Sequence, residues 1–321
     1  MELPMGLRAG IEALAADYPQ AQLLVASRAL TERYQTQSGQ GRRLLTRPVE
    51  AAAYAVVRMP ATFGAVDAAL AAALRQFDGP ITTVLDAGAG TGAAAWAAAA
   101  RLDAPLQITC LEREEAMIAA GKRLAADEPM LQNVRWVRQD VAQAGVSGRA
   151  DLVAASYALN ELDESARARV LGQLWAAADR LLLLVEPGTP VGYAQLRWAR
   201  SWLISQGGFI AAPCPHNEGC PMEPDDWCHF TCRVARSRLH KLLKGGEAPY
   251  EDEKFAFLAV ARQPVRQAQA RVLRHPVKGP GHITLRLCTA EGLQSRTVTK
   301  KDGPLYKKAG KAACGDSFDP A

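Results

Sequence analysis

Short apolar stretches alternate along the middle of the chain with longer segments in which apolar residues have helical spacing. Each short stretch has the length of a strand, and several end at an acidic or turn-forming residue. The alanine-rich segment 93–102 is predicted to be the first helix between two such strands. Strands that alternate with helices in this way predict a doubly wound α/β sheet. The predicted strands are 81–86, 106–112, 134–137, 151–156 and 181–185.

The chain before this sheet is predicted to be helical. Apolar residues between positions 7 and 30 have helical spacing, and the polar, glycine-bearing segment 35–43 predicts a loop. Two alanine-rich helices are predicted at 48–58 and 61–77. Pro60 should separate them, because proline cannot donate the backbone hydrogen bond that a helix interior requires.

A glycine loop follows the first predicted strand. Asp86 ends the strand, and Gly88, Gly90 and Gly92 match the acid-x-G-x-G-x-G motif I of class I S-adenosylmethionine (SAM) methyltransferases. A dinucleotide site is the alternative, since Gly88, Gly90 and Ala93 also fit G-x-G-x-x-G/A. An acid at the strand end would repel a pyrophosphate, whereas it suits a ligand that carries an ammonium and a sulfonium group. The pattern therefore favours SAM over a dinucleotide, and both over a glycine loop without a ligand.

Polar residues at the ends of the later strands are candidates for binding and catalysis. Glu112 ends the second strand about 20 residues after the loop, where a ribose-binding carboxylate belongs. Glu114 and Glu115 are nearby alternatives that we interpret as helix N-terminal charges. Asp140 follows the third strand and could face the adenine amino group or cap a helix. Asn160 follows the fourth strand, where it could position a target atom or cap the next helix.

Composition adds an uneven charge distribution. The chain has 321 residues, 49% of them hydrophobic, and a net charge of +5. Segment 262–311 holds twelve Lys and Arg residues and two acids, a net charge of +10, whereas the residues before it carry −3 and those after it −2. The fold before this segment is therefore close to neutral. A basic C-terminal arm predicts a polyanionic partner, most simply RNA, and a solvated tail is the alternative. Residues 1–20 lack a secretory signal pattern and 181–185 is too short to span a bilayer, so we expect a cytoplasmic protein without membrane contact.

Four of the seven cysteines fall in the proline-rich, acidic segment 212–238. In a reducing compartment a disulfide framework is not expected. Cys214, Cys220 and Cys228 do not have the paired spacing of most zinc sites or of bacterial ferredoxins. Thiols gathered in one loop predict a cysteine-ligated metal centre, and either zinc or an iron–sulfur cluster would satisfy four sulfurs.

Spacing alone does not identify the fourth metal ligand. Cys232 lies one helical turn after Cys228, and Cys288 lies in the alternating segment 283–288, which could fold back onto the loop. His216 and His229 are nitrogen candidates, although loop bracing explains each of them better.

Several segments together resemble one family: the methyltransferase-like proteins of mitochondrial small-ribosomal-subunit assembly and their bacterial relatives. The resemblance extends from about residue 54 to residue 300. The segments that carry it are 54–62, the glycine loop, 185–190, 214–217, 227–230, 276–282 and 287–289.

The resemblance implies a class I methyltransferase fold that binds the small ribosomal subunit or its rRNA. It also implies a [4Fe–4S] cluster whose ligands fall on Cys214, Cys220, Cys228 and Cys288, which leaves Cys232 as the alternative fourth ligand. Zinc remains the alternative metal. We expect an N-terminal helical region at 1–78, a SAM-binding core at 79–210, a cysteine-rich metal-binding segment at 211–261 and a basic extension at 262–321.

Three functions are compatible with these features. The first is a SAM-dependent factor for assembly or modification of small-subunit rRNA. The second is a non-catalytic rRNA-binding protein that reuses the methyltransferase fold, and the third is a methyltransferase for a small molecule. The Asn-Pro-Pro-Tyr signature for transfer to exocyclic nitrogens is absent after the fourth strand. No obligate protein partner is evident.

Overall fold

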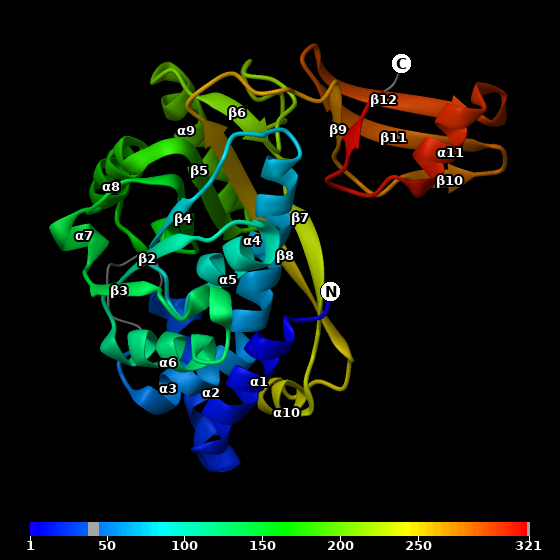
Figure 1. The fold of residues 1–321 in the computed structure, drawn as a ribbon. Helices are drawn as coiled ribbons and strands as arrows, with labels where there is room; N and C mark the ends of the chain where they lie inside the picture. The colour runs from blue at the N-terminus through cyan, green and yellow to red at the C-terminus, as the bar shows by residue number, and fades with distance from the viewer. Residues whose placement is uncertain (38–44, 320–321) are drawn as a thin grey trace.

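The computed structural model describes residues 1–37 and 45–319, and it is built around one eight-stranded sheet (Figure 1). The strand order along the sheet is β3-β2-β1-β4-β5-β8-β6, and β7 pairs with β8. The pairs among β1 to β5 are parallel, whereas β8 is antiparallel to β5, β6 and β7. The strands are β1 (Thr83–Ala87), β2 (Gln107–Glu112), β3 (Arg135–Arg138), β4 (Ala150–Ser156), β5 (Ala178–Pro187), β6 (Phe209–Ala212), β7 (Phe230–Ala235) and β8 (Tyr250–Ala261).

Helices cover both faces of this sheet because its inner strands are apolar on both sides. Along β5, Leu181 and Leu183 pack toward the N-terminal helices, while Leu182 and Leu184 pack toward α8 and α9. The first group of helices is α1 (Met5–Ala16), α2 (Gln20–Gln37), α3 (Pro48–Val57), α4 (Met59–Leu74), α5 (Ala93–Arg101) and α6 (Glu115–Ala125). The others are α7 (Val141–Ala144), α8 (Glu164–Ala177) and α9 (Pro190–Ser205), while α10 (Arg238–Lys244) packs against α2 and α3 on the first side. The sheet and the helices on its two faces form three layers. This is the class I methyltransferase fold that the sequence predicts.

The five strands predicted from the sequence are confirmed within a few residues. The prediction at Pro60 was wrong in detail. The break falls at Arg58, and Pro60 lies in the first turn of α4, where a missing N–H leaves no bond unmade. The two helices are bent by 54° at this break. The predicted loop 35–43 lies mostly outside the described residues, and α2 extends to Gln37.

The basic C-terminal segment is folded rather than extended. It forms a second sheet at the upper right of Figure 1, in the order β10-β11-β9-β13 with β12 paired to β11. This sheet has its own small core, which includes Ile283, Leu285 and Leu287. The predicted strand 283–288 is part of β11. The elements are β9 (Ala270–Val272), β10 (Val277–Gly279), β11 (His282–Thr289), β12 (Gly292–Thr299), α11 (Pro304–Lys311) and β13 (Ser317–Phe318).

No single helix among the described residues is both long and apolar enough to cross a bilayer. The bent pair α3–α4 passes that test by length and composition, and most of its residues are buried against the sheet.

Close contact between α9 and the end of β5 predicts one stability effect. A Cβ on Gly192 would lie 2.2 Å from the carbonyl oxygen of Pro187. We expect Gly192→Ala to lower the free energy of unfolding by about 1–3 kcal/mol, more than the ~1 kcal/mol gained from helix propensity. Gly219→Ala is the control, because nothing lies within 4 Å of its added Cβ. Urea denaturation followed by tryptophan fluorescence measures both, and equal midpoints would contradict the close packing.

Candidate functional site

A cavity of about 410 Å³ lies at the carboxyl ends of β1 to β4. In a doubly wound sheet this is the edge where ligands bind. Helices α2 and α3 cover the cavity, so the N-terminal region forms one of its walls. The residues that line it on the sheet side include Gly88, Gly90, Glu112, Arg113, Glu114, Asp140, Tyr157, Asn160 and Glu161, and those on the helical side include Thr31, Tyr34, Tyr54, Arg58 and Thr62.

The glycine loop has the backbone that the motif requires. Gly88, Gly90 and Gly92 have φ angles of 72°, 56° and 90°, which favour glycine. Gly88 and Gly90 line the cavity, while Gly92 is the N-cap of α5. The loop thus presents bare backbone to the cavity just before a helix N-terminus, an arrangement suited to close approach by a ligand.

Asp86 lies beneath the loop rather than in the cavity wall. Its side chain is fully buried, and neither carboxylate oxygen accepts a hydrogen bond of normal geometry from the described residues. Burial and the nearby Glu112 carboxylate raise the pKa of Asp86 to about 7, although the N–H groups of Ala94 and Ala95 partly oppose this. A buried carboxyl without a well-formed hydrogen bond is costly, which makes Asp86 a candidate for an electrostatic role.

Glu112 lines the cavity and is hydrogen-bonded to the glycine loop. One carboxylate oxygen accepts a hydrogen bond from the N–H of Gly90 and the other from the N–H of Glu114, both at 2.8 Å. Burial raises its pKa. Since each oxygen has a second lone pair, Glu112 can still accept hydrogen bonds from a ligand in the cavity.

Asp140 and Asn160 both line the cavity, but their other roles differ. Asp140 caps α7 by accepting a hydrogen bond from the N–H of Ala142 at 2.9 Å, so the capping interpretation holds for it. The cap of α8 is Asp163, not Asn160, because Asp163 accepts from the N–H of Ala166. The side-chain oxygen of Asn160 is buried and has no hydrogen-bond partner among the described residues.

The sequence suggests that the N-terminal helices form a lid or scaffold for the core, but it does not predict which of their residues, with the end of β4, line the cavity. Tyr54 and Arg58 are one helical turn apart, and the N–H of Arg58 donates to the carbonyl of Tyr54. Tyr157 has a φ of 56°, a strained value for a residue with a Cβ, and its hydroxyl donates to Glu253 at 2.9 Å. The motif at 54–62 was visible in the sequence, but only the fold shows that it faces the glycine loop.

Two further acids sit close to the cavity. Burial raises the pKa of Glu161 to about 7, partly opposed by Arg113. Burial also raises the pKa of Glu186 to about 8; one of its oxygens accepts from the N–H of Leu159 at 3.0 Å and the other has no partner among the described residues. With Asp86 and Glu112, these residues place four carboxyl groups at the strand-end side of the site.

A second, smaller cavity of about 50 Å³ is lined by the four cysteines that the family resemblance selects. Cys214, Cys220 and Cys228 come from the loop after β6, and Cys288 comes from β11 of the second sheet. Burial raises the pKa of the Cys228 thiol, and the charges of the other three add to this. The structure thus brings together residues more than 70 positions apart.

Cys232 lies elsewhere. It is in β7, packed against α4, where its sulfur would be 3.1 Å from a Cβ on Gly64. The two histidines do not line the cavity either. His216 contacts the sulfur of Cys288 through Nε2 at 3.4 Å, and His229 stacks on Trp227.

The thiols do not have the spacing of ligands to one ion. Within residues 1–37 and 45–319, no group of three or more His, Cys, Asp or Glu side chains could hold a metal ion. The predicted metal centre is therefore not shown. Two buried arginines lie beside the thiols: Arg200 donates to the carbonyl of His216 at 2.9 Å, and Arg271 donates to that of Pro213 at 2.6 Å. Neither makes an ion pair with a carboxylate in the part of the chain that is described.

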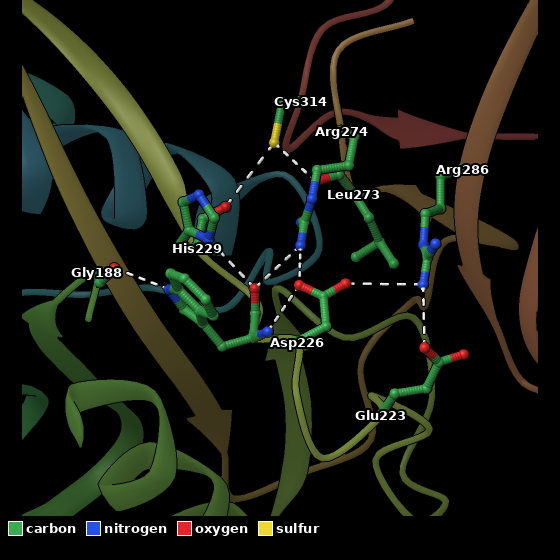
Figure 2. A network of polar contacts seen from close by, with 9 residues as sticks. Gly188, Glu223, Asp226, His229, Leu273, Arg274, Arg286 and Cys314 are labelled. Carbon is green, nitrogen blue, oxygen red and sulfur yellow. Dashed lines mark hydrogen bonds and ion pairs between the residues drawn. The ribbon is translucent and has the colours of Figure 1, made fainter. Parts of the chain in front are cut away.

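Figure 2 shows polar contacts between the second sheet and residues 213–229, the cysteine loop that joins β6 to β7. Arg274 donates to Asp226 and to the carbonyl of Trp227, and Arg286 lies 3.7 Å from Asp226. The indole of Trp227 donates to the carbonyl of Gly188 at 3.0 Å, so the same loop also contacts the end of β5. These contacts hold the three loop cysteines opposite Cys288.

The family described as "Mitochondrial small ribosomal subunit Rsm22" matches residues 48–319, which is most of the chain. The chain belongs to the Rsm22 family. The resemblance found in the sequence is thereby confirmed.

Curated relatives of this Rsm22-family chain agree with that result. It is 28% identical over 255 residues to the human "Ribosome assembly protein METTL17, mitochondrial", covering 73% of this chain and 54% of that one. It is 27% identical over 215 residues to the Schizosaccharomyces pombe "Rsm22-cox11 tandem protein 2, mitochondrial", covering 52% and 29%. The chain thus spans about half the length of the human relative and less of the yeast one.

Solved structures are similar to a lower degree. Magnesium protoporphyrin IX methyltransferase from Synechocystis, with bound SAM, has a TM-score of 0.43 at 16% identity and covers 74% of this chain and 97% of its own. Precorrin-6y C5,15-methyltransferase from Geobacter metallireducens has a TM-score of 0.40 at 13% identity, covering 61% and 87%. The fold assignment rests on the strand order, not on these values.

The prediction of a cytoplasmic protein is contradicted by these relatives, because the matched family and the curated relatives carry mitochondrial names. The physical reason is that composition does not encode the compartment. A near-neutral α/β core with a basic second sheet is compatible with either aqueous environment.

Proposed function

We propose that this chain binds SAM in the 410 Å³ cavity and acts on the small ribosomal subunit, in its assembly or in rRNA modification. The observation that carries the proposal is the joint placement of the glycine loop, Glu112 and an unpartnered buried acid at the carboxyl ends of β1 and β2. This arrangement suits a ligand that has a ribose and a positively charged sulfur.

The chain's own residues have distinct roles in this proposal. The loop around Gly88 and Gly90 lets the ligand approach the backbone, Glu112 accepts from the ribose hydroxyls, and Asp140 faces the adenine. Asp86 and Glu161 favour positive charge in the cavity. When bound, SAM supplies an electrophilic methyl group. Asn160, whose side-chain oxygen is unpartnered, can orient an acceptor, and the helical wall excludes water.

The cysteine cavity is proposed to hold a [4Fe–4S] cluster through Cys214, Cys220, Cys228 and Cys288. Four thiolates with a cluster carry net negative charge, which would complement the buried guanidinium groups of Arg200 and Arg271. In a cluster each thiolate binds a different iron, so ligands spread more widely than around one zinc ion. When bound, the cluster cross-links the loop to β11 and stabilises the junction between the two sheets.

The second sheet is proposed to contact rRNA. It carries most of the positive charge of segment 262–311, including Lys278, Arg296 and Lys307. Basic side chains on a folded face bind phosphates in a salt-dependent manner. The family match and the name of the human relative make the small ribosomal subunit the expected source of that RNA.

The test combines sedimentation and transfer. Anaerobically purified protein is mixed with small ribosomal subunits from its host, in mature and immature forms, and tritiated SAM. We expect co-sedimentation that weakens with salt, and tritium in the rRNA of one form. Co-sedimentation with SAM binding but without transfer would favour the non-catalytic assembly factor. Transfer to small molecules together with no co-sedimentation would contradict the proposal.

A further inference from the structure

The cavity has two electrically different sides. Acids dominate the strand-end side, where Glu112, Glu114, Asp140 and Glu161 line it. Tyrosines and Arg58 form the helical side, where Arg58 caps the end of α3. A ligand that fits both sides must carry positive charge at one end and an anionic group at the other.

Among the described residues, three cations line the cavity, and they differ in their partners. Arg113 has carboxylates within 4 Å on three sides: Glu114, Asp140 and Glu161. Lys244 donates to the carboxylate of Glu251. Arg58 makes no hydrogen bond from its side chain and no ion pair with any residue in 1–37 or 45–319. Its guanidinium therefore has several N–H donors left for an anion in the cavity.

Arg58 follows a helix that packs against the glycine loop. Tyr54, one turn earlier on α3, has its hydroxyl 3.9 Å from the place that a Cβ on Gly90 would occupy. The helix that carries Arg58 therefore packs directly over the loop. Burial disfavours the charged form of Arg58, but the nearby carboxylate of Glu253, which accepts a hydrogen bond from Tyr157, helps to keep the pKa of Arg58 above its ordinary value.

We propose that Arg58 binds the carboxylate of the amino-acid part of the ligand, through a charge-assisted contact from the N-terminal helices. This inference rests on the proposed SAM site and deepens it. It makes α3 part of the binding site, and it gives the cavity a means of distinguishing a complete amino-acid end from a truncated one.

Calorimetric titration of three ligands into the full chain tests the proposal. They are S-adenosylhomocysteine, its decarboxylated analogue and 5′-methylthioadenosine, which lacks the amino-acid part. We expect the wild type to bind S-adenosylhomocysteine at least about tenfold more tightly than either analogue. Arg58→Gln should weaken S-adenosylhomocysteine binding by about 10- to 100-fold and decarboxylated-analogue binding by no more than about twofold.

Controls separate this contact from a structural effect. Arg58→Lys keeps the charge and should restore part of the affinity, and Arg8→Gln, an exposed arginine on α1, should change nothing. A variant that misfolds would lose all three ligands equally, so equal loss overturns the proposal. Unchanged S-adenosylhomocysteine affinity in Arg58→Gln also overturns it. Arg58 would then be free to bind an anionic group of the molecule that accepts the methyl group. No binding by the wild type would overturn the proposed SAM site as well.

Discussion

Replacing Cys288 by serine is expected to release most of the iron from anaerobically purified protein and to lower its melting temperature by roughly 5–10 °C. The reason is geometric. Cys288 is the one lining cysteine that β11 contributes, while the other three come from the loop after β6. Without it, the loop loses its metal-mediated link to the second sheet, and Arg200 and Arg271 lose part of the negative charge beside them.

Cys232→Ser is the matched control, because Cys232 is also buried but packs against α4 away from the cavity. Iron, acid-labile sulfide and the visible absorbance band should be retained in that variant. A larger loss of iron from Cys232→Ser than from Cys288→Ser would contradict the assigned ligand set. Colourless wild-type protein with stoichiometric zinc would show that the four cysteines bind zinc and not an iron–sulfur cluster.

Asp86→Asn is expected to have opposite effects on stability and on binding. The pKa of Asp86 is raised in the folded state, from 3.8 to about 7. The native state therefore binds this proton more tightly than the unfolded state, and wild-type stability falls as the pH rises from about 4 to about 7. Asparagine carries no such charge, so the ligand-free variant should be more stable than the wild type at pH 8, by on the order of 1–3 kcal/mol.

The same substitution should weaken binding of SAM at pH 8 by about tenfold, because it removes a negative charge beneath the loop. At about pH 4, close to the pKa of Asp86 in the unfolded state, the two proteins should unfold at similar urea concentrations. The difference in affinity should already shrink at pH 5, where Asp86 is protonated in the folded state. Asp103→Asn, at an exposed position, is the control. Equal stability of wild type and Asp86→Asn across pH 4–8 would show that folding does not raise the pKa of Asp86.

The sequence predicted the parallel strands well because each is a short apolar segment with a marked end. Asp86 and Glu112 were predicted as strand tips for the same reason, and the structure places both beside the glycine loop. Where Asp86 points was not predictable. Whether a strand-end carboxylate faces the cavity or lies beneath the loop depends on how α5 packs. That packing cannot be predicted from the local sequence.

The helical wall was harder to predict for a different reason. Tyr54 and Arg58 lie on α3 and at its end, about 30 residues before the glycine loop. Only tertiary packing brings Tyr54 close to Gly90 and Arg58 into the same cavity. The basic segment was expected to be an arm because its charge is conspicuous. Its strands carry a small core, and alternation along 283–288 was the one local sign of a sheet. The three loop cysteines and Cys288 were joined by the family resemblance, not by spacing.

Calorimetric titration of S-adenosylhomocysteine into the wild-type chain tests the central claim most directly. The account predicts one saturable site per chain with a dissociation constant in the micromolar range, and competition by SAM but not by NAD. No saturable heat at ligand concentrations up to about 1 mM, or preferential binding of NAD, would contradict it.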